Sequence, residues 1–287
     1  NNNSVVNSTH TPTNMHSLLN PLDSGGSTIS NGNKTLVTTG SSDKSTKATI
    51  RLPTSGKYYW ESNLDVASSA SIGHVIFLTK STQLLTTGNG SWTDTILLNR
   101  SNSGSVKLNG TDIFTISGTA SINDKYQVAV DLDNNKMWFG INNSFFNASG
   151  GTDGNPSTGA NAMIAKDFAG YFPMFGNFNT QQTVRFDSAD WTYTPPTGYV
   201  SLNTTTLAEA TTRTKSNLEE YFSTTTYEGN GAGQRVGKFL PFTNTFTVGK
   251  GALFVNANSE DLSRGSMSGT ATTFTISMWV KRAEPAV

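Results

Sequence analysis

Apolar and polar residues alternate with a period of two in several short segments, and this pattern predicts β-strands. In segment 58–66, Tyr58 and Trp60 fall on one face of an extended chain. Tyr59 and Glu61 fall on the opposite face. Further strands are expected at residues 48–52, 74–80, 94–100, 126–132, 136–142, 171–177 and 183–188.

Two pairs of these segments have the spacing of β-hairpins. Asn134 and Asn135 separate segments 126–132 and 136–142, and we expect them to form a two-residue turn. Asn109 and Gly110 form the expected turn within segment 105–117. Asn and Gly tolerate the positive φ angles that tight hairpin turns require. Many short antiparallel strands at this spacing predict an all-β protein with a two-sheet β-sandwich.

We expect the chain to divide into four segments. Residues 1–17 lead into a β-sandwich at 18–203, a Thr-rich linker follows at 204–245, and strand patterns resume at 246–287. Ser216 and Glu219 have capping-box spacing, which favours a short helix at about 216–222 within the linker. The last segment supplies only about three strands, so we expect it to be completed by further chain or by a neighbouring subunit.

The composition excludes several classes of site. Lys and Arg together number 20, as do Asp and Glu, so the formal net charge is zero, which argues against nucleic-acid and membrane-surface binding. No apolar run approaches the length needed to insert into a membrane, and residues 1–10 lack signal-peptide features. The chain has no Cys, so disulfides and thiolate metal sites are excluded. We expect no cofactor and no metal.

Five motifs in order resemble the SPRY (B30.2-like) family, a concanavalin A-like jelly roll. They are SGKYYWE (55–61), YQVAVDLDNNKMWFGIN (126–142), GTDGNPSTG (151–159), YFPMFGN (171–177) and VRFDSADWTYTPPTGYVSLN (184–203). The resemblance implies a sandwich that binds ligands through its loops. Residues 81–118 carry no clear family motif.

Two motifs near the end resemble the opening strands of a LamG-type domain. They are ALFVNANSEDLSR (252–264) and TFTISMWVKR (273–282). A SPRY unit followed by an incomplete LamG-like unit is similar to structural proteins of tailed-phage virions. This resemblance implies localisation to the virion, other virion subunits as partners, homo-oligomerisation and contact with a host-surface glycan.

Three loop residues are candidates for ligand binding. Trp92 follows Gly88 and Gly90 in a polar segment. An aromatic ring there stacks on a sugar, contacts a protein or folds back over the sheet edge. Asp153 and Asn155 lie in GTDGNPSTG and offer hydrogen bonds, although turn formation also explains them. Five aromatic residues are assigned to the core: Trp60, Trp138, Phe139, Tyr171 and Phe186.

The acidic residues suggest two kinds of chemistry, calcium binding and glycoside hydrolysis. Asp131, Asp133 and Asn135 have alternate spacing like the start of a calcium loop, but the later Gly and Glu of such a loop are missing, so hairpin turn chemistry is favoured. Paired carboxylates such as Glu61 and Asp187 could serve a glycosidase, but no run of closely spaced acidic residues supports this reading. No catalytic residue is assigned.

Three functions from different classes follow. The preferred one is a structural component of a bacteriophage virion (fibre, tail or capsid surface) that displays binding modules. The second is a SPRY-type adaptor that binds peptides. The third is a carbohydrate-active enzyme, and the preferred interpretation is that the chain is not an enzyme.

Overall fold

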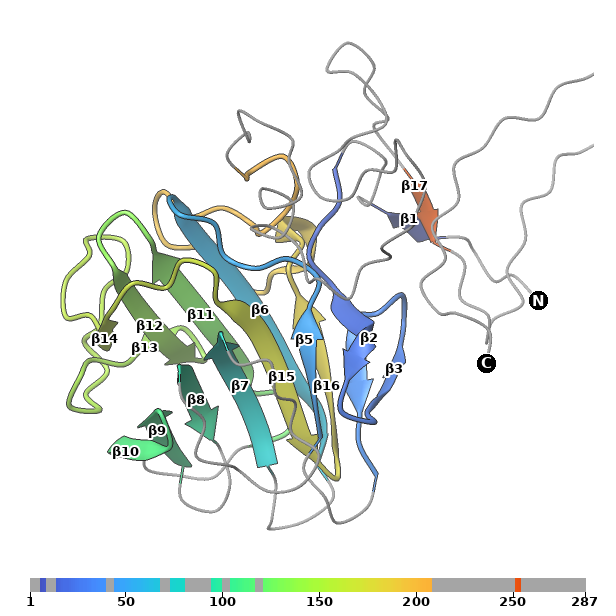
Figure 1. Cartoon of the computed structure of the whole chain (residues 1–287), viewed down its shortest axis with the longest axis horizontal. Helices are drawn as coiled ribbons and strands as arrows, with labels where there is room; N and C mark the ends of the chain where they lie inside the picture. The colour runs from blue at the N-terminus through green and yellow to red at the C-terminus, as the bar shows by residue number, and fades with distance from the viewer. Residues whose placement is uncertain are drawn as a thin grey trace, which may run out of the picture.

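The computed structural model of the chain describes residues 6–8, 14–39, 44–67, 73–80, 94–99, 104–116, 121–207 and 251–253 (Figure 1). Within these ranges the regular structure is β-strand, apart from one 3₁₀ turn, η1, at Ser188–Asp190. In the same ranges no helix is long and apolar enough to cross a membrane. The predicted all-β fold class is confirmed.

The first large sheet has seven strands. They are β2 (Leu19–Ser24), β5 (Lys44–Ala48), β7 (Gly73–Thr79), β8 (Thr95–Asn99), β9 (Gly104–Leu108), β10 (Thr111–Ile116) and β15 (Phe172–Phe178). Their order in space is β10-β9-β8-β7-β15-β5-β2, with antiparallel neighbours. Strand β15 therefore joins the N-terminal strands to the middle of the chain.

The second large sheet has eight strands. They are β3 (Thr28–Ser30), β4 (Thr35–Val37), β6 (Lys57–Ala67), β11 (Lys125–Asp131), β12 (Lys136–Ile141), β13 (Ser144–Phe145), β14 (Ile164–Ala165) and β16 (Thr180–Arg185). The order is β13-β12-β11-β6-β16-β4-β3, and β14 pairs with β12. The long strand β6 lies at the centre, so its residues have a sheet neighbour on both sides.

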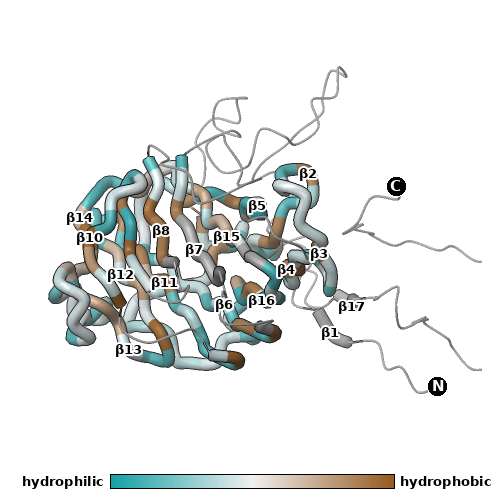
Figure 2. Tube along the Cα trace, turned by 90° about the horizontal axis from the view of Figure 1, so that it is seen from below, coloured by the Kyte–Doolittle hydropathy of each residue, from teal (hydrophilic) through white to brown (hydrophobic). Residues whose placement is uncertain are grey.

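Apolar side chains from the two sheets meet in one core. The ring centroid of Phe186, just after β16, lies 5.8 Å from that of Trp60 on β6 and 5.9 Å from that of Phe175 on β15. Trp60 and Phe175 are fully buried. Figure 2 shows hydrophobic and hydrophilic positions alternating along the strands, as a two-sheet sandwich requires.

The outer face of the second sheet is also covered. Tyr59, Trp138, Phe145 and Tyr199 form a second, smaller apolar cluster there. Tyr59 and Trp191 pack edge to face with ring centroids 4.9 Å apart. The segments that follow the strands lie over this face, so the alternation seen in the sequence separates two buried faces of β6 and β12 rather than a buried and an exposed one.

One of the two predicted hairpin turns has the expected length. Leu108 pairs with Thr111, and Asn109 and Gly110 between them have φ angles of 52° and 81°. The β11–β12 prediction is wrong in loop length. Asp131 pairs with Lys136, so the loop has four residues, Leu132–Asn135. The Asp131 carboxylate accepts hydrogen bonds from the backbone and side-chain nitrogens of Asn134, and this interaction organises the longer loop.

The strand predicted at 48–52 begins and ends earlier. Strand β5 ends at Ala48, a bend follows at Thr49, and residues 51 and 52 have no regular structure. Leu52 instead donates its backbone N–H to Tyr171 and accepts one from Gly170. Ile50 and Leu52 are buried, so the apolar pattern correctly located core residues but assigned them to the wrong hydrogen-bond partners.

The described part of the C-terminal region is the short strand β17 (Gly251–Leu253). It pairs antiparallel with β1 (Val6–Ser8), and Asn7 faces Ala252 across the pair. The helix expected at 216–222 lies outside the described residues, as do the motif residues after Leu253. Those predictions and the four-segment division stay predictions.

Candidate functional site

The loop that carries two predicted binding residues is tied together by its own side chains. Asn147 accepts the backbone N–H groups of Ser149 and Gly151 on Oδ1, and its Nδ2 donates to Asp153 Oδ1. Asn161 Nδ2 donates to Asp153 Oδ2 at 3.0 Å. Both carboxylate oxygens of Asp153 are therefore used within the loop, although the residue is exposed.

Asn155 has a similar role in the next turn. Its Oδ1 accepts the backbone N–H of Thr158 at 3.2 Å, and its backbone exchanges hydrogen bonds with Ala160. The Asn155 side chain is exposed. Asp153 and Asn155 thus lie within one folded loop, where turn formation explains part of their chemistry.

Trp138 anchors this loop to the sheet. Its indole N–H donates to the carbonyl oxygens of Ala160 and Asn161, at 3.2 and 3.0 Å. Gly154 approaches the sheet so closely that a Cβ atom there would lie 2.6 Å from the Phe146 carbonyl oxygen. A glycine is therefore required at residue 154, and the loop is held against a fully buried tryptophan.

All five predicted core aromatics lie in the two apolar clusters. Trp60, Phe139 and Phe186 are buried in the main core, and Trp138 is buried in the smaller cluster. Tyr171 is also buried in the main core, but its surroundings differ, because cationic side chains cover its ring. Trp92 lies outside the described residues, and the structure does not test it.

Two ammonium groups lie over the Tyr171 ring. Lys80 Nζ is 5.1 Å from the ring centroid and Lys166 Nζ is 5.4 Å from it. A third cation is near, because Arg51 Nη1 lies 4.0 Å from where a Cβ of Gly170 would be. We call Arg51, Lys80, Lys166 and Tyr171 the Tyr171 rim. Cation–π attraction accounts for the ammonium positions.

Carboxylates partly balance the charge of the Tyr171 rim. Asp94 Oδ1 lies 3.2 Å from Lys166 Nζ, and Asp94 is 56% exposed. Asp167, next in sequence to Lys166, accepts the backbone N–H of Ala169. Among the described residues Lys80 forms no ion pair, so the rim carries more positive than negative charge.

The protonation states of the rim suit the binding of an anion. Burial lowers the pKa of Lys166, but its interactions with Tyr171 and Asp94 outweigh this effect, so the net pKa is raised. Burial raises the pKa of Tyr171, and Lys166 offsets this only in part. At neutral pH the rim therefore offers a charged ammonium and a protonated phenol. The buried Tyr171 hydroxyl interacts with Lys166 and Asp94 but forms no hydrogen bond of good geometry in the described chain.

Glu61, one of the carboxylates considered for catalysis, is fully buried on β6. It accepts the Tyr59 hydroxyl at 2.7 Å and the backbone N–H groups of Thr192 and Tyr193 at 2.7 and 2.9 Å. Gln127 in turn donates to the Tyr59 hydroxyl. We call Glu61, Tyr59 and Gln127 the Glu61 network. It fastens the segment that covers the outer face of the second sheet.

The residues that resemble a calcium loop also have structural bonds. Asp131 pairs with Lys57 Nζ at 3.0 Å, and Asp133 accepts the Gly56 backbone N–H at 2.8 Å. Burial raises the pKa of Asp131, but hydrogen bonds from Asn134 and Lys57 outweigh it and hold the pKa below its ordinary value. Across the described ranges no group of three or more acidic or histidine side chains is placed to hold a metal ion.

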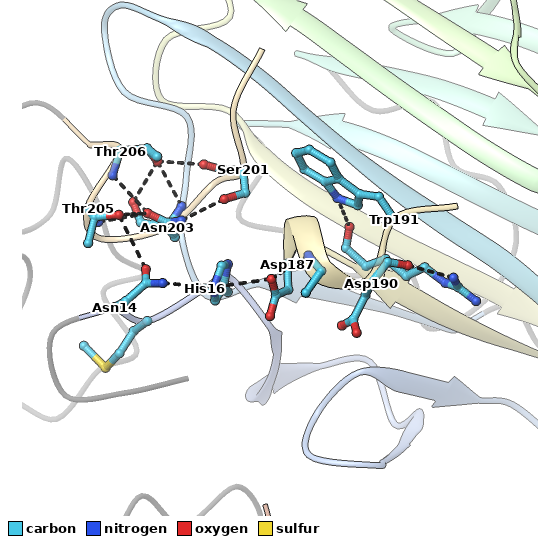
Figure 3. A network of polar contacts seen from close by, with 12 residues as sticks. Asn14, His16, Asp187, Asp190, Trp191, Ser201, Asn203, Thr205 and Thr206 are labelled. Carbon is cyan, nitrogen blue, oxygen red and sulfur yellow. Dashed lines mark hydrogen bonds and ion pairs between the residues drawn. The ribbon is translucent and has the colours of Figure 1, made fainter. Parts of the chain in front are cut away.

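A network of polar contacts, which we call the polar seam, links the segment before β2 to the segment after β16 (Figure 3). His16 and Asp187 are both buried, with Nε2 and Oδ1 3.7 Å apart, and Asn14 contacts the same His16 nitrogen at 3.3 Å. Asn203 donates to Ser201 Oγ, and its Oδ1 accepts several bonds from the turn that follows. The sequence did not single out His16 or Asp187 as a pair, because 171 positions separate them along the chain.

The seam extends the described sandwich at both ends. Ser17 donates its backbone N–H to Leu202, and Thr204 donates to Met15. Leu207 is buried in the main core. Residues 14–17 and 204–207 therefore pack together with the sandwich, and the contacts of His16 and Asp187 hold these segments in place.

Sequence reasoning did not select the lysines of the Tyr171 rim. Lys80 is an isolated charge in its segment, Lys166 is followed only by Asp167, and neither lysine belongs to a motif. The pairing of Phe172 with Thr79 brings Tyr171 next to the end of β7, and β14 brings Lys166 to the same place. The sequence offers one signal for this site: Lys80 and Asp94 lie at the two ends of residues 81–93, the polar segment that contains Trp92.

Comparison with known proteins gives structural neighbours only. No protein-family model matches the chain, and no curated protein matches its sequence. A similar solved structure is the SPRY domain of human HERC1, with 16% identity over 58% of this chain and 96% of that chain and a TM-score of 0.41. Another is a human SPRY domain, with 13% identity over 60% and 96% and a TM-score of 0.40. The sandwich assignment rests on the strand order and core of this chain.

Proposed function

We propose that the chain is a binding module and a structural component of a bacteriophage virion, in a fibre, the tail or the capsid surface. Its partners are other virion subunits, including copies of itself, and a glycan or protein on the host surface. The virion context comes from the sequence resemblance to phage structural proteins. The expected surroundings of the module are therefore a multicopy particle outside the cell.

The observation that carries the binding role is the anchored loop at residues 147–161. Its exposed polar side chains are organised before any ligand arrives, because Trp138 and internal hydrogen bonds fix the backbone. A preorganised surface loses less conformational entropy when it binds. Asp153 and Asn155 remain the proposed contact residues in this loop, with Trp92 as the proposed aromatic contact.

The positions of the carboxylates support binding over hydrolysis. A glycosidase needs an acid and a base that both face the scissile bond. Glu61 is buried and its oxygens accept three hydrogen bonds, while Asp131 is paired with Lys57. We therefore propose a module that acts by contact, without chemistry, a cofactor or a resident metal.

A glycan array tests the proposal, with the chain displayed in many copies because individual sugar contacts are weak. We expect retention on a subset of glycans. Trp92→Ala and Asn155→Ala should reduce it, whereas Ile122→Ala, a change at an exposed residue before β11, should not. Retention of peptides but not glycans supports the adaptor function instead. Release of sugar fragments by the purified chain contradicts the proposal.

A further inference from the structure

We propose that the Tyr171 rim is a binding site for an oxyanion, namely the carboxylate or sulfate group of an acidic polysaccharide. This inference rests on the proposed function and gives it a ligand class. The site consists of two ammonium groups over one buried phenol, those of Lys80 and Lys166 over Tyr171, with the Arg51 guanidinium beside Gly170.

Among the described residues, the carboxylates beside the rim leave Lys80 without an ion pair. The whole chain has zero formal net charge, yet three cations gather here beside Asp94 and Asp167. Both ammonium groups lie within 5.4 Å of one ring centroid. Bringing like charges together is unfavourable, and a bound anion relieves it. Lys80 is exposed and without an ion pair in the described chain, so it is available to a ligand.

The Tyr171 hydroxyl is the second, independent observation. Tyr171 is 0% exposed, and its hydroxyl forms no hydrogen bond of good geometry in the described residues. A buried donor without a well-formed hydrogen bond is costly, so such groups commonly mark a functional position. The hydroxyl lies close enough to Lys166 and Asp94 to interact with both. An oxyanion held by Lys166 would therefore accept the hydroxyl hydrogen bond as well.

Asp94 is a built-in competitor for this site. Its carboxylate occupies Lys166 at 3.2 Å and is more than half exposed, so an incoming anion can replace it. Asp94 has a φ angle of 54°, a left-handed conformation that Asn also adopts readily. Asp94→Asn thus removes the charge without straining the backbone, and we expect it to strengthen anion binding, whereas loss of a lysine weakens it.

Immobilised full-length chain should be titrated with dextran sulfate, with polygalacturonate and with neutral dextran. We expect both charged polymers to bind in preference to neutral dextran, and their relative affinities distinguish sulfate from carboxylate. Lys80→Gln and Lys166→Gln should each weaken binding by about tenfold, the usual size of a charge-assisted contact. Asp94→Asn should strengthen it by about threefold.

The matched control is Lys107→Gln. Lys107 is a partly exposed lysine on β9 that pairs with Asp112, away from Tyr171. Equal losses for Lys107→Gln and Lys80→Gln would reduce the effect to general charge attraction and overturn the inference. Weaker binding by Asp94→Asn would also overturn it.

A titration with inorganic sulfate separates this inference from the proposed function. In the wild-type chain, added sulfate should change the chemical shifts of the Tyr171 ring and of the Lys166 side chain. In Lys166→Gln, the same sulfate concentration should change the chemical shifts of the Tyr171 ring less. Such shifts together with no binding to any glycan would support the site and contradict the glycan function. Glycan binding without these chemical-shift changes and without a preference for charged polymers would support the glycan function and contradict the oxyanion site.

Discussion

The Glu61 network and the Tyr171 rim are both polar clusters built on buried aromatic side chains, but they differ in how their charges are satisfied. Glu61 is fully buried and accepts three hydrogen bonds from its own chain. The rim leaves the Tyr171 hydroxyl without a well-formed hydrogen bond and Lys80 without an ion pair in the described chain. The first arrangement stabilises the fold, and the second leaves interactions for a ligand.

The difference shows that polarity alone does not identify a binding site in this fold. In the sequence, Glu61 is a candidate for a paired catalytic carboxylate, whereas Lys80 and Lys166 belong to no binding motif. In the structure the Glu61 carboxylate is buried and bonded to the Thr192 backbone, whereas the Lys80 and Lys166 side chains are at least partly exposed to solvent. The number of internal partners, more than residue type, distinguishes a structural cluster from a binding cluster.

The largest expected effect is in the Glu61 network. Glu61→Ala removes the acceptor for the Tyr59 hydroxyl and for two backbone N–H groups, and each buried unsatisfied donor costs about 1–3 kcal/mol. We expect the free energy of unfolding in denaturant to fall by about 3–6 kcal/mol. Glu61→Gln keeps one acceptor oxygen and should lose less. Wild-type stability for Glu61→Ala would show that the network is not structural.

Trp60→Ala tests the opposite face of the same strand. Trp60 is fully buried in the main core beside Phe186, so truncation leaves a large cavity. The expected loss of unfolding free energy is about 3–5 kcal/mol. Leu22→Ala is the control, because Leu22 is 63% exposed and should change stability little. Comparable losses for Trp60→Ala and Glu61→Ala would establish that β6 is buried on both faces.

Acid should weaken the Asp131–Lys57 pair. The pKa of Asp131 is lower in the folded state than its unfolded value of about 3.9. Its stabilising contribution is therefore present above about pH 4 and is lost as pH falls through the folded pKa. Asp131→Asn should flatten the acid limb of a stability–pH curve. Asp133→Asn is the control, because Asp133 lies in the same loop and has no ion pair in the described chain. The acid limb of its stability–pH curve should be steeper than that of Asp131→Asn.

The smallest expected effect on stability is in the Tyr171 rim. Lys80→Gln should change the melting temperature by less than about 2 °C, because exposed charges contribute little to folding. A large destabilisation would mean that Lys80 holds Tyr171 in place, and the rim would then resemble the Glu61 network. Thermal unfolding followed by circular dichroism measures this directly.

The sequence predicted much of the fold because strand periodicity is a local signal. The alternation around Trp60 and the Asn109-Gly110 turn both proved correct. It failed where side-chain or distant partners decide the backbone bonding. The β11–β12 loop is longer than expected because Asp131 binds Asn134, and Leu52 donates its backbone N–H to Tyr171 instead of to a neighbouring strand. The Tyr171 rim could not be predicted, because its members meet only after the sheets assemble.

The most direct test of the account measures stability and polymer binding together for Glu61→Gln and Lys80→Gln. We predict a crossed result. Glu61→Gln should lower the melting temperature while dextran sulfate affinity, measured well below that temperature, stays unchanged. Lys80→Gln should keep the melting temperature and lose about tenfold in affinity. If both variants lose stability and neither loses affinity, the distinction between a structural cluster and a binding rim is contradicted.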